Sequence, residues 1–242
     1  MEITASVMIL FLASLGGAFI QRVSGFGFGI FAMTILPYAL PTYGEATTLS
    51  SMLASVTSAI IMVRMFKLID WSKLLPILVT FLVVSYFSIM FVASASDGLL
   101  KKILGAILIL VSIYFFFFSD KVKLKPTLWV QVGMGVISGV MGGLFSMQGP
   151  PAVLYFLACT EKKEEYLVLA QTYFVLGNVM MTLFRAQNGF VTTAVLHAWC
   201  YGLAAVLLGT WIGSKVFRRI SASVLRKIIY AYMAVSGVVA MV

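Results

Sequence analysis

The stretch SMQGPP, residues 146–151, places a glycine and two adjacent prolines inside a run that is otherwise apolar. GVISGVMGGLF (135–145) precedes it and AVLYFLACT (152–160) follows it. Proline lacks a backbone N–H and clashes with the preceding helical turn, so one regular helix is not expected to continue through this stretch. A second interruption, SGFGFG (24–29), lies near the other end of the chain. The sequence therefore predicts apolar helices that are broken at two places.

The composition identifies the class of protein. Of 242 residues, 62% are hydrophobic and only 10% are charged, and the mean hydropathy is +1.06. These values exclude a soluble domain and predict an integral membrane protein. Long apolar runs without alternation exclude a transmembrane β-barrel. MEITASVMIL (1–10) has no basic region, so it predicts a first membrane helix and no cleaved signal peptide.

Apolar segments of about 20 residues are long enough to span a bilayer. Ten segments are separated by charged or turn-rich stretches, and two of them are short for a full crossing. We expect an all-α polytopic protein with 8–10 membrane segments. The ten segments are roughly 4–21, 25–40, 46–66, 74–94, 99–118, 128–147, 150–160, 166–184, 192–214 and 222–242.

The segments repeat at an offset of about 120–125 residues. Glu45 precedes a helix that ends at Arg64, and Glu165 precedes one that ends at Arg185. We therefore expect one transmembrane domain made of two repeats, residues 1–120 and 126–242. Five segments per repeat is an odd number, so the second repeat would lie inverted in the membrane, as in many secondary transporters.

The net charge of +9 belongs mostly to basic residues that flank apolar segments, where such residues fix topology. We read them as topology signals and expect no nucleic-acid partner. Cytoplasmic loops are the expected place for most of these cations, and EKKEE (161–165) falls on the same side. PTYGE (41–45), SASD (94–97) and AQNG (186–189) then lie outside. All acidic residues lie at segment ends or in loops, which argues against a carboxylate proton relay.

The two breaks are the candidate substrate site. A helix that restarts within the membrane directs N–H groups without intrahelical acceptors, and the positive end of its dipole, at whatever lies ahead. Such an end can bind an anion without a charged side chain. Glycines let a ligand approach the backbone closely. The candidate binding residues at the breaks are Ser24, Gly25, Phe26, Gly27, Gly29, Ser146, Gln148, Gly149 and Pro150.

Arg22 and three polar residues complete the candidate site. Arg22 either supplies the positive charge for an anion or extends to the interface or a carboxylate. Gln21, Gln171 and Asn178 either line the pathway or form hydrogen bonds between helices. The remaining small-residue spacings, Gly135-x-x-x-Gly139-x-x-x-Gly143 and Gly209-x-x-x-Gly213, favour close helix packing.

At these breaks the sequence resembles the TauE/SafE sulfite-exporter family, also called the toluene-sulfonate uptake permeases. The resemblance rests on QRVSGFGFGIFAMTILP (21–37), GVMGGLFSMQGPPAVLYFL (139–157) and SASVLRKIIYAYM (221–233). It implies a transporter of sulfur-containing anions in the bacterial inner membrane, with a proton as a candidate coupling ion. Arg22 after Gln21, and Gln148 where a glycine is expected, depart from the family pattern and add polarity at the site. The substrate therefore does not follow from the fold.

We expect a secondary transporter, an exporter of sulfite or an organosulfonate, that works by alternating access around a midplane site between the two breaks. The alternatives are a passive anion channel and an uptake permease for another small organic anion. No hydrolase or metalloprotease motif occurs, so we expect no enzyme, cofactor or metal site. The expected partners are the lipid bilayer, the anion and, as a candidate assembly, a homo-oligomer.

Overall fold

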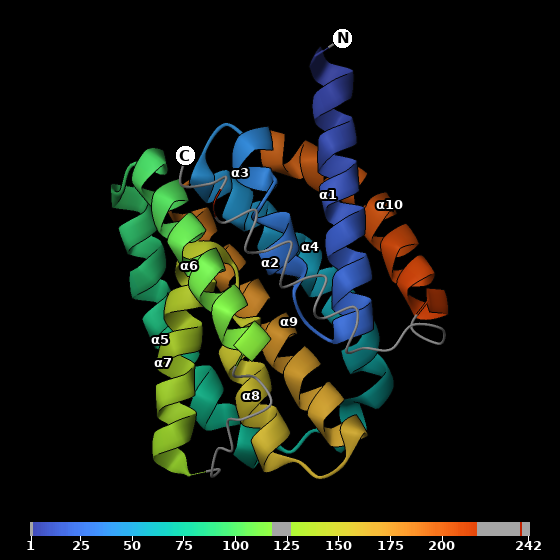
Figure 1. The fold of residues 1–242 in the computed structure, drawn as a ribbon, viewed down its shortest axis with the longest axis vertical. Helices are drawn as coiled ribbons and strands as arrows, with labels where there is room; N and C mark the ends of the chain where they lie inside the picture. Colours follow the sequence, from blue (N-terminus) through green and yellow to red (C-terminus); the bar gives the residue numbers. More distant parts are fainter. Residues whose placement is uncertain (1, 118–126, 217–237, 239–242) are drawn as a thin grey trace.

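The computed structural model describes residues 2–117, 127–216 and 238. These residues form a bundle of helices with no strand among them (Figure 1). The all-α prediction is therefore confirmed for the described part of the chain. In order, the elements are α1 (Glu2–Ser24), α2 (Phe28–Ala32), α3 (Leu36–Ala39), α4 (Tyr43–Met65), the 3₁₀ turn η1 (Phe66–Leu68), α5 (Trp71–Ser94), α6 (Asp97–Phe117), α7 (Leu128–Phe145), α8 (Gly149–Cys159), α9 (Lys163–Gln187) and α10 (Thr193–Val216).

The expected segment 25–40 is two short helices and not one. The chain turns between them, where the Thr34 and Ile35 N–H groups donate to the carbonyls of Phe31 and Ala32. Pro37 lies in the first turn of α3, where a backbone N–H would have no acceptor within the helix, so the missing N–H of proline costs no helical hydrogen bond. Apart from residue 238, the expected segment 222–242 lies outside the described residues, as do the loop lysines 121, 123 and 125.

Three pairs of helices form the core of the bundle. α1 packs along α10 on one side, α5 packs along α7 on the other, and α4 and α9 pack together between them (Figure 1). Glycines permit the close approach in both outer pairs. A Cβ on Gly209 would lie 2.3 Å from the Leu15 carbonyl oxygen, and a Cβ on Gly143 would lie 2.8 Å from that of Ser85. The packing interpretation of these glycines is thereby confirmed.

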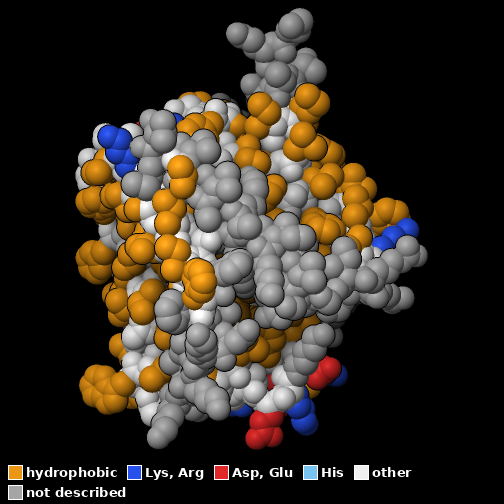
Figure 2. Space-filling model, viewed as in Figure 1, with side chains coloured by type: hydrophobic (Ala, Val, Ile, Leu, Met, Phe, Trp, Pro, Cys, Tyr) orange, Lys and Arg blue, Asp and Glu red, His pale blue; other side chains and the backbone are white. Residues whose placement is uncertain are grey.

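The outer surface matches a membrane environment. Five of the described helices, α1, α5, α7, α9 and α10, are long and apolar enough to cross a bilayer, judged by length and composition. Large apolar side chains such as Phe87 and Trp129 are exposed on the flanks of the bundle. Figure 2 shows hydrophobic side chains covering much of the visible flank, with the visible Asp and Glu side chains gathered at its lower end. An apolar surface of this extent is expected to face lipid.

At one end of the bundle, the loops expected outside the membrane come together. The Asp97 carboxylate accepts a hydrogen bond from the Tyr43 N–H at 3.0 Å. Thr42 and Glu45 form a reciprocal capping box at the start of α4. The same Glu45 carboxylate accepts from the Thr192 hydroxyl at 2.6 Å, which ties α4 to the segment before α10.

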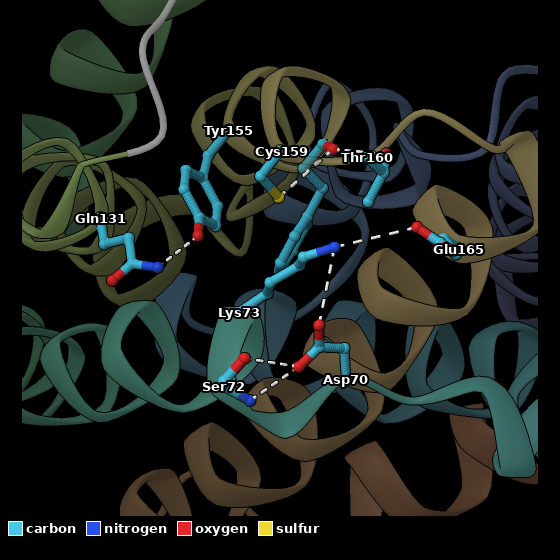
Figure 3. A network of polar contacts seen from close by, with 9 residues as sticks. Asp70, Ser72, Lys73, Gln131, Tyr155, Cys159, Thr160 and Glu165 are labelled. Atoms are coloured by element: carbon cyan, nitrogen blue, oxygen red, sulfur yellow. Dashed lines mark hydrogen bonds and ion pairs between the residues drawn. The ribbon is translucent and has the colours of Figure 1, made fainter.

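At the opposite end, polar groups join α5 to α9 and α7 to α8 (Figure 3). Lys73 lies 3.5 Å from the carboxylate of Asp70 and 3.8 Å from that of Glu165. Asp70 caps α5 by accepting from the N–H and the hydroxyl of Ser72. Residues 70–73 and EKKEE (161–165), which were expected on one side of the membrane, thus lie at one end of the bundle.

Candidate functional site

The first break is formed by glycines in the left-handed region of backbone space. Gly25 has a φ of 86° and Gly27 a φ of 102°, values that side chains with a Cβ rarely adopt. The Ser24 hydroxyl lies 2.8 Å from the Ile20 carbonyl and 2.5 Å from the Phe26 carbonyl, so it spans the turn. These bonds end α1 and allow α2 to begin at Phe28 in a new direction.

The second break is held by Ser138 of α7, whose hydroxyl also accepts a hydrogen bond from α9. Ser146 follows α7 with a φ of 59°, the only non-glycine residue in the described part with a positive φ. α8 then begins at Gly149, with Pro150 in its first turn. The Ser138 hydroxyl donates to the Gln148 carbonyl at 2.6 Å, and the Tyr173 hydroxyl donates to Ser138 at 2.7 Å.

The two breaks meet in the interior. A Cβ on Gly29 would lie 1.9 Å from the Ser146 carbonyl oxygen, a distance that only glycine allows. A Cβ on Gly149 would lie 3.2 Å from the Cβ of Phe26. Segments about 120 residues apart in the chain are therefore in direct contact through their backbones.

A small cavity lies where the breaks meet. Its volume is about 30 Å³, room for about two water molecules. It collects most of the candidate residues, namely Gln21, Phe26, Gly27, Gly29, Ser146, Gln148, Gly149, Pro150 and Asn178. The sequence did not single out the other lining residues, which are Phe28, Ile30, Ala54, Met147 and Phe174.

Four candidate residues do not line this cavity. The Arg22 guanidinium donates through Nε to the Ser214 hydroxyl at 2.7 Å, across the α1–α10 contact. Gln171 donates to the Gly25 carbonyl at 2.8 Å and so holds the first break from α9. Ser24 and Gly25 shape the turn itself. These residues support the geometry of the breaks from outside the cavity.

The cavity wall is uncharged and carries amide groups. Gln21 donates to the Ser58 hydroxyl at 2.6 Å, so it lines the cavity and also bonds α4. Gln148 is buried and donates to the Phe174 carbonyl at 3.3 Å, while its Oε1 has no hydrogen-bond partner. Such a wall suits a compact polar solute.

Arg185 is the functional candidate that sequence reasoning missed. Its side chain is fully buried, with 0% exposed, although it lies only two residues before the end of α9. One guanidinium nitrogen donates to the Thr47 carbonyl and the Ser51 hydroxyl. The other donates to the carbonyls of Gly142 and Gly143 at 3.1 and 3.0 Å, in the last turn of α7. Among the described residues, no carboxylate lies within ion-pair distance of Arg185.

Burying a cation without a carboxylate is costly unless its N–H groups are hydrogen-bonded. Arg185 has four such bonds and an Nε without a partner. A signal was present in the sequence: α4 carries Thr47, Thr48, Ser50 and Ser51 in an otherwise apolar context, and all are buried. In the described part of the chain, no group of three or more His, Cys, Asp or Glu side chains could hold a metal ion.

Comparison with known proteins agrees with this architecture. The family model described as "Sulfite exporter TauE/SafE" matches residues 9–240, nearly the whole chain. A curated protein of Cupriavidus necator, "Probable sulfite/organosulfonate exporter TauE", is 23% identical over 228 residues, which cover 90% of this chain and 86% of that protein. No solved structure matches the chain. The chain is thus a multi-pass membrane protein that belongs to the sulfite exporter TauE/SafE family.

Proposed function

We propose that this protein is a secondary transporter that exports a small sulfur-containing anion, such as sulfite or an organosulfonate, across the bacterial inner membrane. The observation that carries the proposal is the meeting of the two breaks around one small polar cavity. Non-helical backbone inside a membrane protein is tolerated where it lines a cavity, and transporters of several folds bind their substrates at such interruptions.

The arrangement of the helices supports alternating access by two repeats. At the repeat offset of about 120–125 residues, α1 corresponds to α7 and α5 corresponds to α10. The α1–α10 contact in the structure is then the counterpart of the α5–α7 contact. The pairing of α4 with α9 then lies on the axis that relates the halves. In each outer pair, a helix of one half packs on a helix of the other. Rocking of one half against the other would expose the shared cavity first to one side and then to the other.

The substrate class is supported by the chemistry of the site and by the family. The residues that line the cavity include three with amide side chains and one serine, and none with a carboxylate. Sulfite and sulfonates are compact oxyanions that accept several hydrogen bonds. The relative in Cupriavidus necator is named as an exporter of such anions.

The test is efflux from proteoliposomes loaded with ³⁵S-sulfite under anaerobic conditions. We expect the rate of efflux to saturate with the sulfite concentration. Unlabelled sulfite on the opposite side should accelerate efflux, because the loaded carrier of such a transporter returns across the membrane faster than the empty one. Efflux without saturation or such acceleration would indicate a channel. Efflux equal to that of protein-free liposomes, for sulfite and for methanesulfonate, would refute the proposal.

A further inference from the structure

Arg185 and the cavity are joined by two serine hydroxyls. Ser51 on α4 accepts a hydrogen bond from the Arg185 guanidinium, and its Oγ lies 2.8 Å from the Oγ of Ser146. Ser146 lies in the second break and lines the cavity. All three side chains are buried, so bulk water does not separate them.

The direction of the hydrogen bond between Arg185 and Ser51 follows from the donor inventory. A guanidinium has only donors, so Ser51 Oγ must be the acceptor in its bond to Arg185. Ser51 then has one hydroxyl proton, and its other hydrogen-bond contact is Ser146. If Ser51 donates to Ser146, the hydroxyl proton of Ser146 remains for an acceptor elsewhere. The described side chains provide no second partner for this hydroxyl, and the cavity lies next to it.

A chain of hydrogen bonds that begins at a cation polarises each member in the same direction. The Ser146 hydroxyl at the end of this chain is thus a stronger donor than an isolated serine. In an enclosed site, such a donor forms a stronger hydrogen bond with an anion than with a neutral molecule of the same shape.

We propose that Arg185 is a positioning residue that makes the cavity selective for anions, acting through the hydroxyls of Ser51 and Ser146. The inference rests on the proposed function and assigns its charge selectivity. Arg185 also caps the carbonyls at the end of α7, which is a structural role. The experiment must therefore separate anion binding from folding.

The experiment measures binding of ³⁵S-sulfite to the full-length protein in detergent, together with its melting temperature. Ser51→Ala and Ser146→Gly each interrupt the chain, and glycine suits the positive φ at position 146. Ser55→Ala is the matched control, because the Ser55 hydroxyl donates to the Met52 carbonyl of its own helix. Competition by methanesulfonate and by uncharged dimethyl sulfone, which has nearly the same shape, reports selectivity for charge.

We expect either variant to raise the Kd for sulfite about tenfold, the effect of losing one hydrogen bond to a charged group. The double variant should bind sulfite no more weakly than the single variants, because either substitution alone already interrupts the hydrogen-bond chain from Arg185 to the cavity. Preference for methanesulfonate over dimethyl sulfone should fall in parallel. Arg185→Gln protein that keeps a cooperative melting transition should lose the preference for methanesulfonate over dimethyl sulfone as well. Ser55→Ala should bind as the wild type does.

Two results would overturn the inference while leaving the proposed function in place. One is wild-type sulfite affinity in folded Ser51→Ala and Ser146→Gly. The other is a loss of affinity in the double variant equal to the product of the two single losses, which would mean that the hydroxyls act separately. Absence of sulfite and methanesulfonate binding by the wild type would overturn both.

Discussion

Gly29 and Ser146 are in contact through their backbones, at the one point where a Cβ on Gly29 would lie 1.9 Å from the Ser146 carbonyl oxygen. The atoms in contact belong to the backbones of Gly29 and Ser146, so the contact cannot adjust by a change of side-chain rotamer. It fixes the distance between the two breaks and thereby the shape of the cavity.

The first prediction follows from this contact. Gly29→Ala should push the breaks apart, with a loss of stability of at least about 1–3 kcal/mol, the usual range for overpacking in a core. The melting temperature in detergent and sulfite efflux should both fall. The matched control is Gly133→Ala on α7, where a Cβ would meet no atom within 4 Å and alanine should favour the helix. Equal melting temperatures for Gly29→Ala and the wild type would contradict so close an approach of the two breaks.

The second prediction concerns charge in the cavity. Gln148 lines it and is buried, so Gln148→Glu would place a carboxylate beside a bound anion. We expect sulfite efflux to fall at least about tenfold, which corresponds to about 1.4 kcal/mol of repulsion. Gln148→Met, similar in size and uncharged, should cost less activity. The kinetic readout is the KM for sulfite, and a lower KM in Gln148→Glu would argue against an anionic substrate.

The third prediction concerns the end of the bundle where Thr42, Glu45 and Thr192 meet. Glu45 is 5% exposed and accepts from the N–H of Thr42 and the hydroxyl of Thr192. Glu45→Ala should reduce the free energy of unfolding by about 0.5–2 kcal/mol, because it removes half of the capping box and the hydrogen bond from Thr192. Glu161→Ala, at an exposed position, is the control and should melt like the wild type.

The fourth prediction is a pH dependence at the opposite end (Figure 3). The Ser72 hydroxyl donates to Asp70, and this hydrogen bond is the main reason that the pKa of Asp70 is lowered from its ordinary value of 3.8. A lowered pKa in the folded protein means that the stabilisation is complete above the ordinary value and disappears as the pH falls through the folded one. Asp70→Ala should therefore be less stable than the wild type at pH 7, by about 0.5–2 kcal/mol for a lost N-cap.

Melting temperatures from pH 7 to pH 3 test this prediction. The gap between wild type and Asp70→Ala should stay constant down to about pH 5 and narrow below about pH 4. Ser72→Ala should make the total narrowing smaller, since it removes the hydroxyl that lowers the pKa of Asp70 and so brings the folded pKa closer to the ordinary value. A gap that is the same at pH 3 and pH 7 would exclude the carboxylate as the cause.

Local patterns in the sequence were sufficient for the helices and for both breaks. Glycines and prolines within apolar runs placed the interruptions at residues 24–29 and 146–151, and in the structure α2 begins at Phe28 and α8 at Gly149. They did so because these residues act on the backbone next to them. The division of segment 25–40 was harder to predict, since its only local sign is Pro37.

Arg185 could not be assigned in the same way. In sequence it is a cation at the end of a helix, a place where arginine usually fixes topology. Its burial depends on contacts with α4 and α7, which lie more than 40 residues away in the chain. Arg22 looked more prominent because apolar residues surround it, yet its guanidinium donates to Ser214 outside the cavity lining. Which arginine faces the interior is decided by tertiary packing.

The buried Arg185 also bears on how the membrane voltage would affect transport. Without a carboxylate at ion-pair distance among the described residues, the empty site carries a positive charge, and a bound monovalent anion would cancel it. A charge that crosses the whole membrane field does work of about 2.3 kcal/mol per 100 mV. The empty and loaded forms of the carrier would then respond differently to voltage. An inside-negative potential would act mainly on the step in which the empty carrier returns.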